Sequence, residues 1–314
     1  MSVVIRSYNR LPWLCELVEA LLAQDHDAFE VIVVEQSTDV PADAAARLAG
    51  LERDPRLRVV RSAPLGGARA RNVGVEHTRG DVVVFIDDDD LPGGSDFLAA
   101  MERPFREDPR CVGATARHRW GDREPGTLYR FYAWRRCMRL APITRVAYTY
   151  ARHDRPCRVD WVHGTGGAIR RSVFERFGGW DEDTPIEDEA SLAYRLAGRL
   201  AAGEHLVFDP RATLERRMEL PGGLGKRFAT AAGFYQRFLT FVHHVLARYH
   251  PWRVRLLYPL YVGAGVRWTV AWIWSDAVAY DTTGKRLGAT ARFLVGLPRQ
   301  AWLAWRRPFG RPPG

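Results

Sequence analysis

Residues 81–90 of this 314-residue chain read DVVVFIDDDD, an apolar run that ends in four consecutive aspartates. Such a run is typical of a strand that is buried on both faces of a parallel sheet. Four adjacent carboxylates repel one another unless a cation offsets their charge, and oxygen ligands suit Mg²⁺ or Mn²⁺. A solvated acidic turn is the alternative interpretation, but the position directly after a buried strand favours a metal site.

Strand-like and helix-like segments alternate in the sequence before this run. We expect strands at Val3–Ser7, Phe29–Glu35, Leu57–Arg61 and Asp81–Ile86, and helices at Leu11–Leu22, Ala42–Leu51 and Ala68–Glu76. Asn9 is the expected N-cap of the first helix. The alternation predicts an α/β protein with a doubly wound, mostly parallel sheet, whose ligands bind beyond the carboxyl ends of the strands.

Polar residues occur where that rule places a binding site. Ser7-Tyr8-Asn9 follows the first strand, and Glu35-Gln36-Ser37 follows the second. Gly66-Gly67 opens a helix that carries Arg69 and Arg71. These glycines could simply start the helix, but a helix N-terminus with arginines beside a metal site also suits a diphosphate.

Three segments together resemble the family 2 glycosyltransferases of the GT-A fold: SYNR (7–10), EVIVVEQSTD (30–39) and GGARARNVGVEHTRGDVVVFIDDDD (66–90). No P-loop or dinucleotide fingerprint competes with this resemblance. It implies that Asp87 and Asp89 bind the metal, Mg²⁺ or Mn²⁺. It also implies that a nucleoside diphosphate sugar is bound by Ser7, Tyr8, Asn9, Arg10, Glu35, Gln36, Arg71, Asp87 and Asp88.

The resemblance continues through Trp161–Arg195, where WVHGTGGAIRRSVFERFGGWDED (161–183) is similar to the family's acceptor-side segment. Trp180 could stack on a sugar face or be a core aromatic residue. The residues expected to bind the acceptor are His163, Gly164, Thr165, Gly166, Trp180 and Glu187.

The family places a Glu-Asp pair before the helix that we expect at Ala190–Leu200, with the Asp as general base and an Arg on the next helix turn. Here Arg195 comes eight residues after Glu187, instead of seven, so the register leaves two choices. We favour Asp188 as the base, with Glu189 as the runner-up. Acids are also favoured at a helix N-terminus for dipole reasons alone.

The strand that includes residues 208–212 resembles the one that closes the GT-A domain. In many relatives a histidine follows it, whereas this chain has Glu215-Arg216-Arg217, so the resemblance supplies no third protein ligand for the metal. Residues 121–158 match nothing in the family pattern and are a candidate lid or acceptor-recognition insert. We expect a GT-A domain over 1–221, with a donor half of about 1–120 and an acceptor half of about 159–221, and a helical tail over 222–314.

Charge separates the two parts. The chain has a formal charge of +9, which divides into −3 for residues 1–221 and +12 for residues 222–314. The tail also holds six of the eleven tryptophans, a combination typical of membrane-surface helices. Residues 256–274 are long enough to span a bilayer, but the central Arg267 disfavours insertion by about 2.5–3.5 kcal/mol. A packed helical subdomain is the remaining alternative.

Together with the family resemblance, these observations predict a metal-dependent, non-processive glycosyltransferase of cell-surface glycan or glycolipid assembly. The resemblance also implies inversion at the anomeric carbon. The enzyme's expected partners are the sugar donor, a glycan or lipid-linked acceptor and an anionic membrane, on whose cytoplasmic face it would be peripheral. Nucleic acid is not expected, because no nucleic-acid-binding motif accompanies the pI near 9.7. Widely spaced cysteines favour a reducing compartment, and no signal peptide is evident. The alternative functions are a nucleotide-sugar-binding protein with little turnover and, less favoured, a nucleotidyltransferase.

Overall fold

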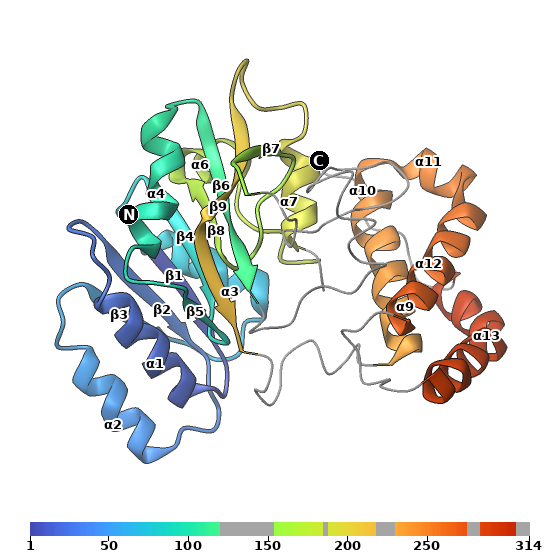
Figure 1. Ribbon diagram of the computed structural model, residues 1–314, viewed down its shortest axis with the longest axis horizontal. Coiled ribbons are helices and arrows are strands. Elements are labelled where there is room, and N and C mark those ends of the chain that lie inside the picture. The colour runs from blue at the N-terminus through green and yellow to red at the C-terminus, as the bar shows by residue number, and fades with distance from the viewer. Residues whose placement is uncertain (120–153, 185–187, 218–229, 275–282, 306–314) are drawn as a thin grey trace.

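The structure, a computed structural model, describes residues 1–119, 154–184, 188–217, 230–274 and 283–305 (Figure 1). The strands are β1 (Ser2–Ser7), β2 (Glu30–Glu35), β3 (Leu57–Arg61), β4 (Val82–Asp87), β5 (Asp90–Pro92), β6 (Cys111–Arg119), β7 (Cys157–Val159), β8 (Gly167–Arg170) and β9 (His205–Arg216). The helices that cover them are α1 (Leu11–Leu22), α2 (Ala42–Leu51), α3 (Gly67–Glu76), α4 (Phe97–Glu107), α6 (Arg171–Phe177) and α7 (Asp188–Leu196).

The strands form one nine-stranded sheet in the order β3-β2-β1-β4-β8-β6-β9-β5, with β7 also paired to β9. The first four strands in this order are parallel, and β8 is antiparallel to both β4 and β6. The long strand β9 runs parallel to β6 and antiparallel to β5 and β7. The carboxyl ends of β1, β2 and β4 therefore meet at one edge of the sheet, as the sequence predicts.

Side chains of alternate residues in β1 enter different cores, because successive residues of a strand face opposite sides of a sheet. Val3 and Ile5 belong to the cluster that includes residues of α1, α2 and α4. Val4 belongs to the cluster with residues of α3, α6 and α7. The sheet is thus covered by helices on both faces, which confirms the doubly wound α/β architecture.

The expected elements before residue 88 are confirmed to within one residue or so at each end. The expected capping role of Asn9 is wrong. Arg10 occupies the N-cap position of α1, and no side chain caps the helix there. Asn9 has a left-handed backbone (φ 53°), and its Oδ1 accepts hydrogen bonds from the backbone N–H groups of Thr38 and Asp39 at 2.8 and 3.2 Å. The side chain therefore joins the ends of β1 and β2.

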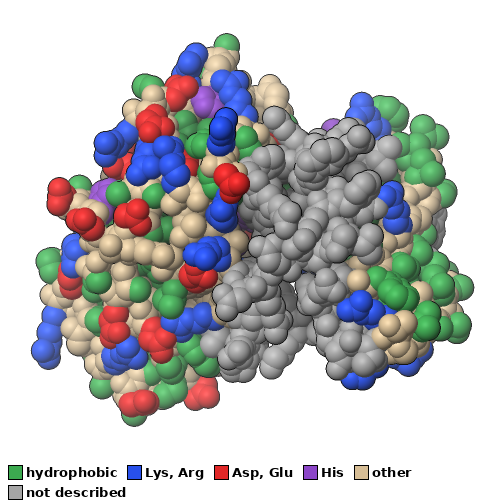
Figure 2. Space-filling view, in the orientation of Figure 1, with side chains coloured by type: hydrophobic (Ala, Val, Ile, Leu, Met, Phe, Trp, Pro, Cys, Tyr) green, Lys and Arg blue, Asp and Glu red, His purple; other side chains and the backbone are tan. Residues whose placement is uncertain are grey.

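The tail is helical, and it differs from the catalytic body in charge. Its elements are α9 (Ala231–Phe241), a π-helical segment η1 (Val242–Leu246), α10 (Ala247–Tyr249), α11 (Pro251–Leu256), α12 (Tyr258–Ile273) and α13 (Thr283–Trp305). The described tail residues include no Asp or Glu. Figure 2 shows acidic and basic side chains intermixed over the body on the left, and basic and hydrophobic ones on the tail at the right.

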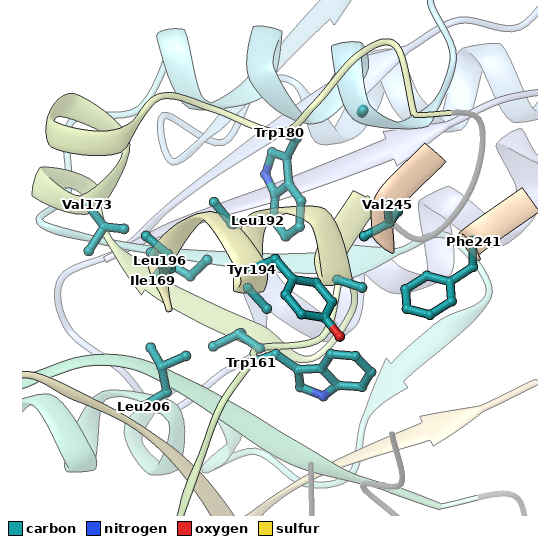
Figure 3. Close-up of a cluster of buried hydrophobic side chains, with 14 of the residues drawn as sticks. Trp161, Ile169, Val173, Trp180, Leu192, Tyr194, Leu196, Leu206, Phe241 and Val245 are labelled. Carbon is teal, nitrogen blue, oxygen red and sulfur yellow. The ribbon is translucent and has the colours of Figure 1, made fainter. Parts of the chain in front are cut away.

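The tail shares a hydrophobic core with the body. Phe241 and Val245 lie in the same buried cluster as Trp161 and Tyr194, on the side of the sheet that α7 covers (Figure 3). Burial of apolar surface contributes about 25 cal/mol per Å². The burial of these aromatic and aliphatic side chains is therefore the main favourable term in packing the tail against the body. The charge boundary near residue 222 is therefore not a boundary between separate cores.

The second tail cluster joins α9, α12 and α13. The α12 residues Tyr261, Gly265, Thr269 and Ile273 are buried at a four-residue spacing. A Cβ on Gly265 would come within 2.7 Å of the Phe238 ring, so the close approach of α12 to α9 requires glycine. Within the described ranges, no helix has both the length and the apolar character needed to cross a membrane.

Two leucines of the tail allow a matched test of this packing. Leu246 is fully buried against the body, whereas Leu256 is 69% exposed. We expect Leu246→Ala to lower the free energy of unfolding by about 2–5 kcal/mol, because it leaves a cavity, and Leu256→Ala to change it by less than about 0.5 kcal/mol. Urea unfolding followed by circular dichroism measures both, and equal effects of the two substitutions would contradict the shared core.

Candidate active site

The ends of β1 and β4 place the guanidinium of Arg6 beside Asp87, the first of the four aspartates. Arg6 and Asp87 are register partners on neighbouring parallel strands. The Arg6 guanidinium donates to both carboxylate oxygens of Asp87, from Nε at 2.9 Å and from Nη2 at 3.1 Å. This bidentate geometry is the strongest form of an Arg–carboxylate pair.

The next two aspartates are bound from the start of α1. Arg10 Nη1 lies 2.9 Å from Asp88 Oδ1 and 3.0 Å from Asp89 Oδ2. The Ser7 hydroxyl donates to the other oxygen of Asp88 at 2.9 Å. The polar residues that follow β1 therefore do contact the aspartates that follow β4.

Arg71 connects this acidic group to α7. Its Nη1 donates to Asp188 Oδ2 at 2.5 Å, and its Nη2 lies 3.4 Å from Asp87 Oδ1. The guanidinium carbon is 5.1 Å from the centre of the Trp180 ring, and the side chain is almost fully buried. A residue from each half of the expected site thus contacts the same guanidinium.

Thr165 links the acceptor-side segment to the aspartates. Its hydroxyl donates to Asp90 Oδ2 at 2.6 Å and accepts from the backbone N–H of Asp87 at 3.0 Å. Its carbonyl oxygen lies 3.0 Å from Nε2 of the buried His118. Because this oxygen can only accept, the His118 ring donates from Nε2 and is neutral, with a pKa well below the usual range owing to burial.

Three carboxylates could hold a metal ion here. One oxygen from each of Asp87, Asp89 and Asp90 lies within 4.8 Å of the others. Asp90 Oδ1 is buried and has no hydrogen-bond partner among the described residues, and Arg216 Nε is 3.9 Å away from it. An unsatisfied buried carboxylate oxygen beside two other acids is the kind of donor set that a hard divalent cation satisfies.

Burial and charge separate the pKa values of the acids. Burial would raise the pKa of Asp87, but Arg6 and Arg71 outweigh it and hold that pKa well below the usual range. Burial raises the pKa of Asp88 and of Asp188 to about 6 in spite of the neighbouring arginines. Burial and the charges of Asp89 and Asp87 raise the pKa of Asp90 to about 7. Asp87 is therefore the most firmly ionised of these four groups.

A pocket of about 490 Å³ lies beside the site, at the end of β2. Its lining comprises Leu11, Glu35, Ser37, Val40, Ala45, Leu48, Arg61, Ser62 and Ala63. Glu35 accepts a hydrogen bond from the backbone N–H of Ser37 at 2.7 Å, and Gln36 accepts one from Leu65 at 2.8 Å. Gln36 is therefore held by the loop before α3, and Glu35 is the expected donor-site residue that faces this pocket. Tyr8, which the sequence also predicts to bind the donor, is half exposed and does not line this pocket.

The glycines of the acceptor-side segment permit close approach. A Cβ on Gly164 would come within 2.7 Å of Arg71 Nη2. Gly166 has a φ of 64°, a conformation that favours glycine, and its N–H donates to the Phe85 carbonyl at 2.8 Å. The His163 ring packs 5.0 Å from that of His118. The segment is therefore held against the end of β4.

The expected stacking of Trp180 on a sugar is wrong. Its side chain is 2% exposed and belongs to the hydrophobic core. It makes edge contacts with Phe85 at 5.1 Å and packs against Phe174. With Arg71 over the ring as well, the indole has no face free for a ligand.

Asp188 opens α7, so the expected helix begins two residues earlier than the sequence predicted and ends earlier, at Leu196. Glu189 is partly exposed, and Glu187 lies outside the described residues. Arg195 contacts the carbonyl oxygens of Phe177 and Gly179. Its Nη2 also lies 3.6 Å from Asp181 Oδ2, so Arg195 fixes the turn before α7.

The family model described as Glycosyl transferase family 2 matches residues 2–178, more than half of the chain. This protein belongs to that family. An uncharacterized glycosyltransferase of Rickettsia felis is 36% identical over 92 residues, which are 29% of this chain and 15% of that protein. The glycosyltransferase EpsJ of Bacillus subtilis, also uncharacterized, is 26% identical over 250 residues, which are 76% of this chain and 70% of that protein.

Solved structures share the fold of this transferase. The mannosyltransferase PcManGT from Pyrobaculum calidifontis, in complex with GDP-Man and Mn²⁺, has a TM-score of 0.55 at 22% identity and covers 96% of this chain and 82% of its own. TarS 1-349 of S. aureus, in complex with UDP-GlcNAc, has a TM-score of 0.53 at 13% identity. The match covers 97% of this chain and 89% of the TarS chain. These likenesses confirm the predicted GT-A fold, and the family model confirms the predicted glycosyltransferase family.

Sequence reasoning missed three residues of the transferase's site: Arg6, His118 and Arg216. Arg6 is a charge inside an otherwise apolar buried strand, which is a signal in itself, because such a charge needs a partner. Arg216 lies 3.3 Å from Asp89. His118 had no signal in the sequence, because its role depends on the pairing of β6 with β8 and β9.

Thr165 offers a test of how the transferase holds its aspartates. We expect Thr165→Val to lower the free energy of unfolding by about 1–3 kcal/mol, because it leaves a buried oxygen of Asp90 without its donor. Thr165→Ser keeps the hydroxyl and should recover most of that loss. Urea unfolding measures both variants, and a valine variant as stable as the serine variant would contradict the role of this hydrogen bond.

Proposed function

We propose that this transferase moves a sugar from a nucleoside diphosphate sugar to an acceptor hydroxyl, with inversion at the anomeric carbon and with Mg²⁺ or Mn²⁺ on the diphosphate. The observation that carries the proposal is the Arg71 guanidinium, which lies 3.4 Å from Asp87 and 2.5 Å from Asp188. A donor-side acid and an acceptor-side acid are thus one side chain apart, the arrangement that a single displacement needs. The GDP-Man and Mn²⁺ bound to PcManGT support the donor class and the metal.

The donor would extend from the pocket at the end of β2 to the aspartates. The pocket lined by Glu35 and Ser37 has room for a nucleobase, and the base identity stays open among uracil, thymine and guanine. The proposed donor-binding residues are Ser7, Tyr8, Asn9, Arg10, Glu35, Gln36, Arg71, Asp87 and Asp88.

The cation would be held by Asp87 and Asp89, with the orphaned oxygen of Asp90 as a third ligand. When bound, it would offset the negative charge that develops on the departing diphosphate. The buried position of Asp90 keeps one ligand fixed by Thr165 before the donor arrives.

Asp188 is the proposed general base. Its pKa of about 6 leaves it ionised at neutral pH while keeping it basic enough to accept a proton from an attacking hydroxyl. Arg71 donates to Oδ2, whereas Oδ1 accepts from the backbone N–H of Glu189 at 3.2 Å and keeps a second lone pair for the acceptor hydroxyl. Inversion follows if the hydroxyl attacks from this side as the diphosphate leaves from the other.

The acceptor is proposed to be a glycan or lipid-linked saccharide, bound by His163, Gly164, Thr165, Gly166 and Glu187. The +12 tail supports the lipid-linked case, because cationic surfaces with interfacial tryptophans associate with anionic membranes. We therefore propose that the tail rests on such a membrane surface.

Substitution of the two neighbouring acids tests the base. We expect Asp188→Asn to lower kcat by about 10²–10⁴-fold with donor binding retained, and Glu189→Gln to lower it by less than about tenfold. In the wild-type enzyme, kcat/KM should rise as the pH increases through about 6, because only the ionised Asp188 accepts a proton. Nucleoside diphosphate release with a panel of nucleotide sugars measures both.

Full activity of Asp188→Asn would mean that the assigned base is wrong. A wild-type protein that binds nucleotide sugars without turning any of them over would support the alternative of a binding protein.

Removal of the metal tests the cation. We expect EDTA to abolish transfer, Mn²⁺ or Mg²⁺ to restore it, and Asp89→Ala to weaken Mn²⁺ binding at least about tenfold, since a carboxylate ligand is lost. Asp96→Ala, which removes an exposed acid nearby, is the matched control. Calorimetry measures Mn²⁺ affinity directly, and activity that survives both EDTA and Asp89→Ala would exclude the metal.

A further inference from the structure

A second pocket, of about 440 Å³, lies where the tail meets the catalytic body. We name it the α7–α11 pocket, and its lining comprises Tyr194, Arg195, Ala197, Arg199, Tyr249, His250 and Arg253. It exists because the chain breaks its helix at His250 (φ −137°, ψ 57°) and restarts it at Pro251, which turns α11 away from α10. The pocket is separate from the one that we assign to the donor.

The charges around this pocket are unbalanced. Among the described residues, three arginines line it and no Asp or Glu does. Arg195 is occupied by the carbonyl oxygens of the turn before α7 and by Asp181, 3.6 Å away. Arg199 and Arg253 make no ion pair with any residue that the structure describes, and the nearby Asp183 is taken by Arg248 at 2.5 Å. Two cations that repel each other across a concave surface favour an anionic ligand.

The walls of the pocket are rigid. The rings of Tyr194 and Tyr249 stack at 5.7 Å with an interplanar angle of 20°. The Tyr249 hydroxyl lies 3.3 Å from Ser191 Oγ on α7. Burial and the charge of Arg253 lower the pKa of His250, so at neutral pH its ring is a neutral hydrogen-bonding group. A ligand would therefore meet preformed aromatic walls with the arginines beside them.

Large apolar side chains lie near the pocket-lining Arg253, in α11 and at the start of α12. Trp252, Leu256 and Leu260, which we name the apolar rim, are 63%, 69% and 57% exposed. Trp252 and Leu256 are four residues apart on one side of α11, and the Arg253 guanidinium lies 5.2 Å from the Trp252 ring. Leu260 follows in the first turn of α12. Figure 2 shows hydrophobic side chains interspersed with basic ones along this outer part of the tail.

We propose that the α7–α11 pocket binds the phosphate of an anionic lipid headgroup while the apolar rim enters the interface of the bilayer. A soluble phosphate would satisfy the arginines but would leave the rim in water, whereas a lipid satisfies both. Arginine suits this ligand because its planar guanidinium matches phosphate oxygens in pairs. This inference rests on the proposed membrane association of the tail and gives it a specific ligand.

Vesicle binding by the full-length protein tests the inference. The probes are vesicles of phosphatidylcholine with 30% phosphatidylglycerol, and of phosphatidylcholine alone, at about 0.1 M salt. We expect Arg199→Gln/Arg253→Gln to weaken binding to the anionic vesicles by about 25-fold, which is about fivefold for each arginine. Trp252→Ala/Leu256→Ala should weaken binding to both kinds of vesicle.

The matched control is Arg53→Gln/Arg58→Gln, which removes the same charge from two exposed positions beside and on β3, in the catalytic body. We expect it to bind as the wild type does. If the pocket variant also binds as the wild type does, the pocket assignment is wrong while membrane association stands. If the wild type binds neither vesicle, both the membrane association and the lipid site fail.

Inorganic phosphate separates the two sources of the ligand. We expect a 10-fold excess of inorganic phosphate not to displace the protein from anionic vesicles, because the rim contributes to binding. The control is chloride at the same ionic strength. Thermal stabilisation by phosphate that Arg199→Gln/Arg253→Gln abolishes, in a protein that binds no vesicles, would overturn the lipid assignment. Nucleoside diphosphate release in solution should be the same for all three variants, so the proposed chemistry is judged separately.

Discussion

The contact on which the site depends is the buried guanidinium of Arg71 between Asp87 and Asp188. A buried arginine is costly unless its charge is compensated, so α3, β4 and α7 must come together for any of the three charges to be stable. Trp180 fills the space beneath the guanidinium, and Gly164 leaves room for it above. Trp180, which the sequence offered as a possible sugar-stacking residue, is therefore a core residue.

The N-terminal half of the fold was predictable because its signals are local. Apolar runs and helical spacing set the elements, and the polar residues after each strand marked the correct edge of the sheet. The site was predictable only in part. Pairing across β4, β8 and β6 brings Thr165 and His118 to the aspartates, and nothing in a local pattern reports such pairing. The spacing before α7 left two candidate bases open, and the choice of Asp188 stays a proposal that its contact with Arg71 supports.

Charge is used differently in the two parts of the chain. In the body, arginines such as Arg6 and Arg10 are inserted between aspartates, so the net charge stays small although the site is dense with ions. In the described tail no acid is present, and the cations face outward beside exposed apolar groups. A single figure for the net charge of the chain hides this division.

The helix α7 has a different environment at each end. Asp188 begins it beside Arg71, and the residues that follow Leu196 lie against the tail. Its nine residues rise only about 13 Å, and a helix that short moves as one body. A ligand that shifted the tail end of α7 would therefore also change the surroundings of Asp188, and by thermodynamic reciprocity a ligand bound at Asp188 would change the affinity at the other end by the same factor.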